Sequence, residues 1–516
     1  MLKYIPILFL SLQLHAQVGI FVKYKTIETQ NIRATFSNDG RLTGYYNQSI
    51  SLLWPKDDPH PCLVFELGFW ILGFRNDSLV GAVPMYLPGY TPGPIISGQS
   101  AISIAPEDSA FYKSYLISNN SGPGDPDYDE WPSKWGAPTY RDGTPKLTGD
   151  VMLWTVYNDA NPNVKLYSES KPHNTFIEVH ESIWGYFKPG TLGNVLFFKW
   201  QIYNKSDQPL DSVIICHWND IDVVDPLGDF PGYDLNNEYG YVYDEELWAI
   251  SDEKFGAEIV SFFLLQGPLV SDNTAVGYSF GKEFNGYRNL STTSFWGIDS
   301  DTIPFDMFGA MPTSLQQIYY FATGRRYDGS PIINPISGDT TSFTHTGNPI
   351  TKEGWIMTHR TGGECGYFIS SGPFTMAPSD SQEVIIALAA ARGDSINDAY
   401  ENLYNKIEFI RSFYNDSIKI IPEEPPIIPD NFVLNQNFPN PFNSQTNIKY
   451  SIPSKGEIKF SFYNILGELI ETIVKRHDEP GTFNLKWIPR DISTGIYFYN
   501  VQFQNITDTK KCLFIK

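Results

Sequence analysis

The scarcity of helical periodicity constrains the fold of this chain more than any other feature. Across about 400 residues, from position 17 to position 414, one segment alone has apolar side chains at helical spacing. In that segment Ser395 is placed to cap a helix, with Asp398 three residues further on. The apolar positions are Ile396, Ala399, Tyr400, Leu403, Ile407, Ile410 and Tyr414. The rest of this stretch must therefore be built mainly from strands.

Strand patterns dominate the same stretch. Over residues 196–202 apolar and polar side chains alternate, so one face of a strand is apolar. Residues 204–209 are typical of a turn and residues 213–218 resume a strand, so the two strands are predicted to pair as a hairpin. Further strands are predicted over 65–74, 151–157, 175–180 and 384–390. Because about 400 residues exceed one ordinary core, we expect one large β-sandwich or two packed ones.

Composition agrees with a packed, mostly β protein and excludes two other classes. Aromatic residues make up 15% of the 516-residue chain, and charged residues make up 18%. So many aromatic side chains exclude a wholly disordered chain. The net charge of −21 argues against a protein that holds nucleic acid through bulk positive charge, so no nucleic-acid partner is expected.

The first sixteen residues have the layout of a secretory signal peptide. Lys3 precedes an apolar run over 4–12, and Ala16 supplies a small residue at the cleavage position. This run is too short to span a bilayer as a helix, and no later segment has 18 uninterrupted apolar residues. We therefore predict a signal peptide over 1–16, with Gln17 as the first mature residue, and no transmembrane span.

A proline-rich segment divides the mature chain. Residues 421–430 read IPEEPPIIPD, and four prolines in ten residues favour an extended, semi-rigid linker. The linker separates a β-rich stretch over 17–420 from a C-terminal segment over 431–516. The C-terminal segment has ten Lys and Arg against seven Asp and Glu, a charge of +3, so the rest of the chain carries −24. The two parts therefore differ in charge as well as in pattern.

The C-terminal segment combines closely spaced strand patterns with a set of short motifs. With no helical period between its strands, it is predicted to form a small β-sandwich. Its blocks LNQNFPNPFNSQTNIKYSIP, FYNILGELI, GTFNLKW, STGIYFYNV and KKCLFIK resemble, in this order, the type A C-terminal sorting domain of type IX secretion substrates. The motif positions are Pro439, Asn440, Pro441, Phe442, Asn443, Gly467, Gly481, Gly495, Tyr497 and Lys516. Departures are small: Ser444 replaces the usual proline after Pro-Phe-Asn, and Cys512 stands in the final strand.

This resemblance implies a route, a set of partners and a location. It implies a small Ig-like sandwich over 431–516 and translocation across the outer membrane by the type IX machinery. It also implies removal of this domain by a sortase-like peptidase and, frequently in the family, attachment to surface lipopolysaccharide. The expected location is therefore extracellular or the outer-membrane-attached cell surface. The blocks WPKDDPH, PGPI, WPSKWGAP and LWTVYNDA are similar to those of large passengers that carry this sorting domain, which implies no particular activity.

A group of candidate ligands follows the predicted strand over 213–218. The segment HWNDIDVVDPLGDFPGYD places Asp220, Asp222, Asp225 and Asp229 on a turn-rich loop at a strand end. Hard oxygen ligands of this kind suit Ca²⁺, but Val224 occupies the third ligand position of an EF-hand and excludes that motif. These four residues are the candidates for a structural calcium site, and no other cofactor is indicated. Two alternatives stay open: an acidic loop whose carboxylates hold turn backbone, or paired carboxylates that hydrolyse glycosides.

Three other motifs match catalytic or binding patterns. Residues 277–281 read GYSFG and match the nucleophile elbow, but no helical period follows, so a serine in a strand or turn is favoured. Residues 392–394 spell Arg-Gly-Asp, where a strand end followed by a helix cap explains all three residues. Trp131 and Trp135 lie in a loop where they either stack on sugar rings or close the end of a sandwich, and the second is favoured.

Histidine and cysteine spacing points to no further site. His173, His180 and His217 are not separated by metal-ligand intervals. Four widely spaced cysteines cannot make a disulfide framework, so free thiols are expected. They are Cys62, Cys216, Cys365 and Cys512.

The sequence therefore predicts a secreted or surface protein of the type IX route. The stretch over 17–420 is predicted to be a structural or binding module, for adhesion or glycans. The alternative is a secreted hydrolase, with glycans as the expected substrates.

Overall fold

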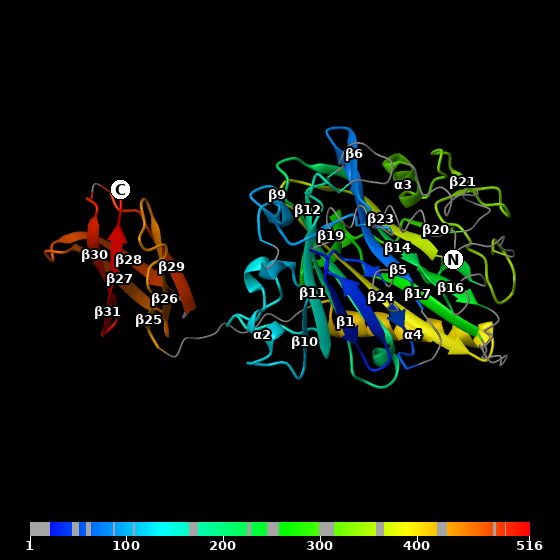
Figure 1. Cartoon of the computed structure of the whole chain (residues 1–516), viewed down its shortest axis with the longest axis horizontal. Coiled ribbons are helices and arrows are strands. Elements are labelled where there is room, and N and C mark those ends of the chain that lie inside the picture. Colours follow the sequence, from blue (N-terminus) through cyan, green and yellow to red (C-terminus); the bar gives the residue numbers. More distant parts are fainter. Residues whose placement is uncertain are drawn as a thin grey trace. The chain divides into compact units, whose positions relative to one another are not determined.

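The computed structural model describes most of the chain. The described residues are 21–43, 51–57, 63–85, 88–106, 109–164, 174–223, 229–244, 257–298, 314–357, 366–420, 431–477, 481–490 and 492–516. The chain divides into two compact units, Met1–Ile421 and Pro422–Lys516 (Figure 1). We call the first unit the passenger and the second the C-terminal unit. The predicted signal peptide and the predicted linker lie outside the described residues.

Two nine-stranded antiparallel sheets build the passenger. Sheet I has the order β1 (Tyr24–Glu28), β2 (Arg33–Ser37), β3 (Leu42–Thr43), β5 (Glu66–Arg75), β14 (Leu210–Asp220), β23 (Gly366–Met376) and β20 (Ser294–Ile298), with β4 (Leu52–Leu53) on β2 and β6 (Ser78–Ala82) on β5. Sheet II has the order β10 (Tyr115–Ser118), β11 (Val151–Asn158), β12 (Ile177–Gly185), β13 (Val195–Asn204), β24 (Ser381–Gly393), β17 (Ala257–Gln266), β16 (Tyr239–Asp244) and β15 (Phe230–Asp234), with β7 (Thr91–Pro92) on β11.

The passenger also contains smaller elements outside the two large sheets. The β18 (Leu269–Ser279) and β19 (Lys282–Asn289) strands form a separate hairpin. The remaining short elements are β8 (Ile95–Ile96), β9 (Gln99–Ser100), β21 (Ile332–Ile333), β22 (Thr340–Thr341), α2 (Pro126–Asp129) and 3₁₀ turns at Ala101–Ser103, Ala110–Tyr112, Ser133–Trp135 and Thr191–Asn194.

The main core lies between sheets I and II. Aliphatic and aromatic side chains from both sheets fill it and are almost completely buried. The Phe69 ring of β5 stacks on the Trp200 ring of β13 with 4.7 Å between centroids, and Phe36 of β2 meets Phe198 of β13 edge to face. Burying a large apolar side chain stabilises a fold by about 1.5–3 kcal/mol, so this shared core holds the two sheets together.

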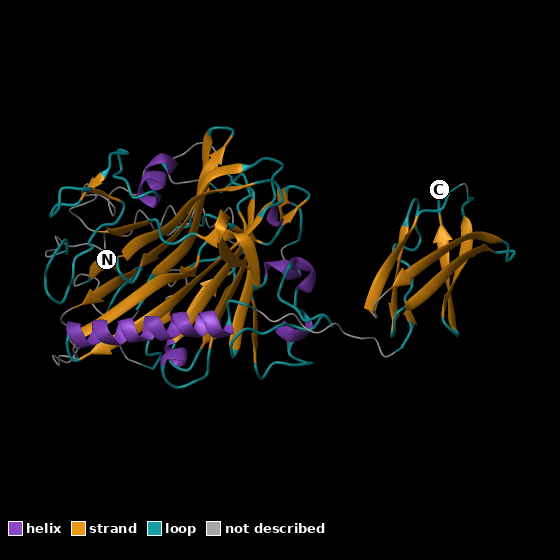
Figure 2. Ribbon diagram, turned by 180° about the vertical axis from the view of Figure 1, so that it is seen from behind, coloured by secondary structure: helices purple, strands orange, loops and turns teal. Residues whose placement is uncertain are grey.

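The predicted helix covers the outer face of sheet II. Helix α4 (Ile396–Ser417) lies along the strands (Figure 2), and its apolar stripe, including Leu403 and Ile407, packs on that face. The Ser395 hydroxyl accepts a hydrogen bond from the Asp398 amide and caps the helix, as the sequence predicts. In the same sheet β11 is buried along its whole length, because Leu153 faces the core between the sheets and Trp154 packs against Trp131 on the outer face.

A second helix covers the outer face of sheet I, and the sequence pattern did not predict it. Helix α3 (Leu315–Ala322) packs Phe321 against Trp296 of β20, with 5.2 Å between ring centroids, and against Phe368 of β23. Eight residues are too few for a clear helical period. The local signal is Ser314, whose hydroxyl accepts from the Gln317 amide as an N-cap.

The predicted hairpin over 196–218 is wrong, although both of its strands exist. Strand β13 pairs with β12 and β24 in sheet II, whereas β14 pairs with β5 and β23 in sheet I. The turn after Asn204 therefore carries the chain across the core from one sheet to the other. The turn between β23 and β24 makes the reverse crossing beside it. Both crossings meet at Asn204, whose Nδ2 donates to the carbonyls of Gln208 (3.0 Å), Met376 (3.1 Å) and Ala377 (3.1 Å).

The C-terminal unit is a separate small β-sandwich. Its three-stranded sheet has the order β25 (Val433–Leu434), β26 (Thr446–Ile452) and β29 (Gly481–Trp487). Its four-stranded sheet has the order β28 (Leu469–His477), β27 (Gly456–Asn464), β30 (Gly495–Phe503) and β31 (Ile506–Phe514). The two sheets enclose their own core, in which the rings of Trp487 and Phe462 stack at 4.0 Å. The chain is therefore mostly β, with a large sandwich, one long helix and a small C-terminal sandwich, as predicted.

Candidate functional site

The Pro-Asn-Pro-Phe-Asn motif lies beside the last strand of the C-terminal unit. The Phe442 amide donates to the Leu513 carbonyl (3.0 Å), and the Ile515 amide donates to the Phe442 carbonyl (2.8 Å). The Leu513 amide in turn donates to Oδ1 of Asn440 (2.8 Å). The Phe442 side chain is buried against Trp487. The motif therefore ties the start of the unit to its end.

The Gly467 motif forms a tight turn between β27 and β28. Oδ1 of Asn464 accepts from the amides of Leu466 (2.9 Å) and Glu468 (3.0 Å), and the Gly467 amide donates to the Asn464 carbonyl (3.0 Å). Gly467 has φ +79°, a left-handed conformation that favours glycine, and nothing lies within 4 Å of the place of a Cβ. A glycine is therefore favoured at position 467 by its left-handed backbone conformation, and not by a lack of room for a side chain.

Other motif positions gather at the same end of the unit. Gly495 begins β30, and the neighbouring Thr494 hydroxyl accepts from the Lys516 amide (2.9 Å). Tyr497 pairs with Asn464 across β27 and β30, which places it beside the Gly467 turn. Gly481 does not join them, because it lies at the opposite end of β29 from Trp487. Four sequence blocks that are far apart in the chain thus meet at one end of a sandwich.

The acidic loop after β14 is partly described. Strand β14 ends at Asp220, whose side chain is buried, and Asp229 is wholly buried. The Val223 amide donates to Oδ2 of Asp229 (3.1 Å), so the residue that ends this loop contacts a residue near its beginning. Asp225 lies outside the described residues. In the part of the chain that the structure describes, no three His, Cys, Asp or Glu side chains gather in a group suited to a metal ion.

The serine of the GYSFG motif lies in a hairpin. Ser279 ends β18 and pairs with Lys282 of β19, and the two residues between them, Phe280 and Gly281, have φ of 51° and 71°. Two central residues with positive φ make the tight turn that joins antiparallel strands. Because no helix follows, the geometry of a nucleophile elbow is absent at Ser279.

The Arg-Gly-Asp tripeptide takes part in the junction between β24 and α4. Nε of Arg392 lies 3.1 Å from Oε1 of the buried Glu258, and its guanidinium lies over the Trp54 ring. Gly393 ends β24 in close contact with the helix, where a Cβ would lie 2.3 Å from the Ala399 amide nitrogen. Packing therefore accounts for these two residues.

The loop tryptophans and the histidines also have structural contacts. Trp131 is buried, and its Nε1 donates to the Pro138 carbonyl (2.8 Å), while Trp135 meets Phe111 edge to face. His180 is within hydrogen-bond distance of Glu178, with 2.9 Å between Nε2 and Oε1. His217 lies between the rings of Trp200 and Phe262, and burial lowers its pKa to about 3. His173 lies outside the described residues.

Two of the cysteines are described. Cys216 and Cys512 are free and buried, as expected, and burial raises the pKa of each thiol to about 12. Such thiols are inert because the thiolate is disfavoured. Cys62 and Cys365 lie outside the described residues.

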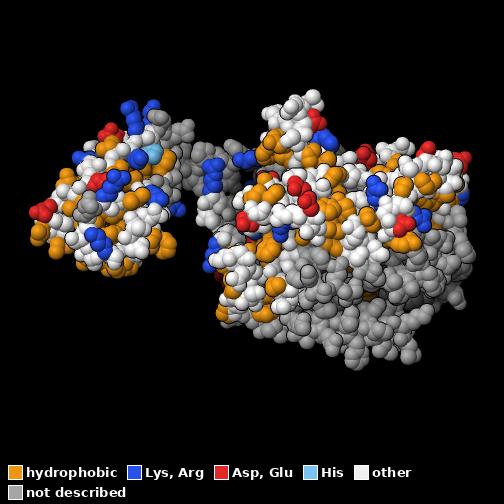
Figure 3. Space-filling view, turned by 90° about the horizontal axis from the view of Figure 1, so that it is seen from above, with side chains coloured by type: hydrophobic (Ala, Val, Ile, Leu, Met, Phe, Trp, Pro, Cys, Tyr) orange, Lys and Arg blue, Asp and Glu red, His pale blue; other side chains and the backbone are white. Residues whose placement is uncertain are grey.

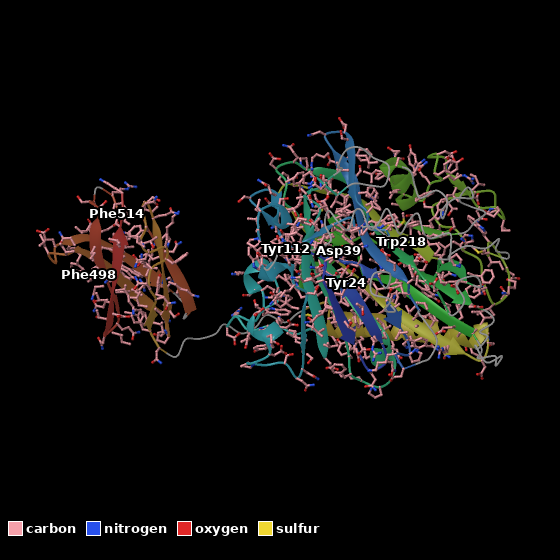
Figure 4. The ribbon with its side chains drawn as sticks, in the orientation of Figure 1. Tyr24, Asp39, Tyr112, Trp218, Phe498 and Phe514 are labelled. Atoms are coloured by element: carbon pink, nitrogen blue, oxygen red, sulfur yellow. The ribbon has the colours of Figure 1, made fainter. Side chains whose placement is uncertain are left out.

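The sequence reasoning missed a buried group of ionisable side chains between sheets I and II. Asp39 and Arg41 belong to the turn between β2 and β3, are wholly buried and form an ion pair with 2.9 Å between Nη2 and Oδ2 (Figure 4). Nη1 of Arg41 lies 3.8 Å from Oε1 of Glu66, which is also buried. The turn fits closely: a Cβ on Gly40 would lie 2.3 Å from the Tyr157 ring.

Glu181 of β12 completes this buried group. Nε1 of Trp200 donates to its Oε1 (2.7 Å), while its Oε2 has no hydrogen-bond partner among the described residues. Burial, with a smaller contribution from the negative charge of Asp39, raises the pKa of Glu181 to about 8. Glu181 is therefore protonated at neutral pH. The sequence signal is positional: Glu181 shares the inward-facing parity of Val179 and Ile183.

Comparison with known families decides the role of the C-terminal unit. Residues 436–516 match the family described as the secretion system C-terminal sorting domain. The chain is a type IX secretion substrate. The C-terminal unit is its sorting domain, the partner that it engages is the type IX secretion machinery, and its destination is the cell surface or the extracellular space. None of the helices that the structure describes has both the length and the apolar character needed to cross a membrane.

Comparisons of the whole chain add little about the passenger. No curated protein matches the chain. A solved polysaccharide lyase is 8% identical, with a TM-score of 0.20, over 70% of this chain and 39% of the lyase. The dimeric latent PorU from Porphyromonas gingivalis is 10% identical, with a TM-score of 0.15, over 96% of this chain and 32% of PorU. The chain thus spans less than two fifths of either structure, and neither likeness bears on the function of the passenger.

Proposed function

We propose that the passenger is a binding module that the sorting domain delivers to the cell surface, where it takes an extracellular glycan or an adhesion ligand. The observation that carries this proposal is the combination of an export domain with a β-sandwich in which two motifs that match catalytic or binding patterns, GYSFG and Arg-Gly-Asp, have structural roles. Ser279 lies in a hairpin turn and Arg392 in an ion pair with Glu258.

Binding is tested with the purified chain from residue 17. Soluble polysaccharides and an immobilised glycan array are screened, and hits are measured by isothermal titration calorimetry. A saturable heat with unchanged ligand supports the binding proposal. Release of reducing ends from any ligand in the same incubation contradicts it and supports the alternative.

The alternative is a secreted glycan hydrolase. Glycoside hydrolysis needs one carboxyl that stays protonated near neutral pH beside one that is ionised. The raised pKa of Glu181 and its proximity to Asp39 are the specific support for this alternative. Both side chains are wholly buried between the sheets, so binding remains the leading proposal. Loss of hydrolysis in Glu181→Gln without a fall in melting temperature would favour the alternative.

We also propose that the sorting domain is removed on export and that the passenger is joined to surface lipopolysaccharide. The support is the family resemblance together with the division into two units, each with its own core. Intact-mass analysis of the surface form tests the removal: a product that ends before residue 431 is expected. A ladder of slower bands that lipopolysaccharide-deficient cells lack tests the attachment.

A structural calcium site at Asp220, Asp222, Asp225 and Asp229 remains part of the proposal. Its support is the return of the loop, through the bond from the Val223 amide to Asp229, which brings the two ends of the acidic segment together. Carboxylate oxygens on such a loop suit Ca²⁺. Chelation is expected to lower the melting temperature of the passenger, and Asp225→Asn is expected to abolish that difference. An unchanged melting temperature after chelation refutes the site.

A further inference from the structure

Large apolar side chains are exposed on the sorting domain more often than on the passenger. Twelve of the twenty-four exposed large hydrophobic residues in the described part of the chain belong to residues 431–516. Singly exposed apolar residues are ordinary, whereas a contiguous group marks an interaction site. Figure 3 shows hydrophobic and basic side chains side by side on the surface of this domain.

Five of these residues form one group at the end of the four-stranded sheet that carries the Gly467 turn. Tyr463 pairs with Leu469 on one side and with Phe498 on the other, so these side chains share the outer face. Ile496 lies two residues before Phe498 on the same face. The exposed fractions are 69% for Ile465, 77% for Leu466, 58% for Leu469, 41% for Ile496 and 37% for Phe498. We call these five residues the apolar end.

The turn holds its two apolar residues outward. Asn464 fixes the turn through its own side chain, which accepts from two amides and donates through Nδ2 to Glu468 (2.7 Å). Ile465 and Leu466 occupy the centre of this turn and add little to the core of the domain, because most of each side chain faces solvent. A turn of this kind tolerates polar residues. Their apolar character therefore points to contact with another molecule.

Two lysines border the apolar end on the side of β31, and one carboxylate, Glu468, is exposed in the turn itself. Lys511 of β31 is exposed and pairs directly with Phe498, and Lys516 is exposed beside Thr494 at the start of β30. The sorting domain carries +3, whereas the rest of the chain carries −24. A partner that fits this surface is apolar at its centre and carries carboxylates at its rim. Such carboxylates attract Lys511 and Lys516, and they do not attract the passenger, whose net charge is negative.

We propose that the apolar end is the surface by which the sorting domain docks on the type IX export machinery, at an apolar site rimmed by carboxylates. This inference rests on the export role of the sorting domain and names the surface that performs it. Ile465 and Leu466 are its central contacts, Phe498 and Leu469 extend it along the sheet, and Lys511 supplies charge at the rim. Bulky apolar anchors at the centre of an interface commonly carry most of its binding energy.

The test compares two double variants of the full chain in a type IX-competent host. I465N/L466N places polar residues at the apolar end. V474N/I506N is the matched control, because Val474 and Ile506 are 49% and 50% exposed on the same sheet, away from the turn. The measurement is the ratio of surface and secreted chain to periplasmic chain. We expect at least a tenfold fall for I465N/L466N and less than a twofold change for V474N/I506N.

Two further measurements separate docking from other causes. Lys511→Glu is expected to lower the ratio by a smaller factor of about three, with a stronger effect at low ionic strength in binding to membranes that contain the machinery. The purified variants must melt within 2 °C of the wild type, so that misfolding is excluded.

Three outcomes overturn the inference. Export of I465N/L466N at the wild-type ratio does so, as does an equal loss in V474N/I506N. A purified chain that is dimeric, and that I465N/L466N makes monomeric, assigns the surface to a second copy instead. Deletion of 431–516 gives an independent reading: if it blocks export while I465N/L466N does not, the export role stands and the docking surface is wrong.

Discussion

Replacing Glu181 with glutamine should stabilise the passenger by an amount that depends on pH. Glutamine has the shape of a protonated glutamate, and its side-chain oxygen still accepts from Nε1 of Trp200. It cannot ionise. Any difference in the free energy of unfolding between the two proteins that changes with pH therefore reports the ionisation of Glu181 alone.

The magnitude follows from the pKa of the buried group. Burial raises the pKa of Glu181 from 4.5 to about 8, so between these pH values the folded chain holds a proton that the unfolded chain has lost. Stability falls with rising pH wherever the folded state binds more protons. The wild type therefore loses stability from about pH 4.5 to pH 8 relative to Glu181→Gln. At 1.36 kcal/mol per pH unit the accumulated loss is about 3 kcal/mol at pH 7 and about 4 kcal/mol at pH 8, where the folded group is half ionised.

A difference measurement is essential because His217 acts in the opposite direction. Burial lowers the pKa of His217 to about 3, so the unfolded chain binds a proton below pH 6.5 that the folded chain does not. This contribution lowers stability as the solution becomes more acidic. It is the same in wild type and variant, so it cancels in the difference.

The assay is urea unfolding followed by tryptophan fluorescence at pH 5, 6, 7 and 8. Eleven of the twelve tryptophans lie outside residues 431–516, so the signal reports mainly the passenger. Glu401→Gln, on the exposed face of α4, is the control for replacing a glutamate at a solvent-facing position. A constant difference for Glu181→Gln across this range would show that Glu181 is not a buried neutral carboxyl and would refute the reasoning.

Four other substitutions should each change stability through one contact, measured by urea unfolding. Asp39→Asn removes the nearer of the two carboxylates beside the buried Arg41 and should cost about 3–5 kcal/mol; a cost under 1 kcal/mol would contradict the buried ion pair. Asn204→Ala should cost about 2–3 kcal/mol, because the carbonyls of Met376 and Ala377 lose their donor. Ser395→Ala should cost about 1 kcal/mol as the loss of a helix cap, and restoration by Ser395→Asp would confirm the capping role. Phe442→Ala should cost about 3–5 kcal/mol in the transition of the sorting domain, followed through Trp487 in the isolated 431–516 unit, and leave the passenger transition unchanged.

Local patterns in the sequence were sufficient for the long helix and for six strands of the passenger, whereas others, such as β17 and β23, were not predicted. The α4 period and the Ser395 cap involve residues within a few positions of each other, so the sequence alone reveals them. The pairing of β13 and β14 was mispredicted because a short turn suits both a hairpin and a crossing between sheets. Which one forms depends on partners such as β24 and β5, which are far away in sequence.

The candidate sites were predictable to different degrees. The sorting motif was recognisable because several spaced blocks occur in order, but only the fold shows that Gly467, Gly495 and Lys516 meet at one end while Gly481 does not. Glu181 was not foreseen, because its neighbours Asp39 and Trp200 come from distant segments. Its burial is a tertiary property that spacing does not encode.

The paired crossings at Asn204 bear on how the passenger responds to force. One side chain fastens the link from β13 to β14 and the link from β23 to β24. Since these are central strands of both sheets, the layers are pinned together near the middle of one margin. A pull that separates the sheets at this margin must therefore break the three hydrogen bonds of Asn204, while the step from β14 of sheet I to β15 of sheet II joins the sheets again at the other end of β14. Asn204 therefore links the two sheets of the passenger at this margin.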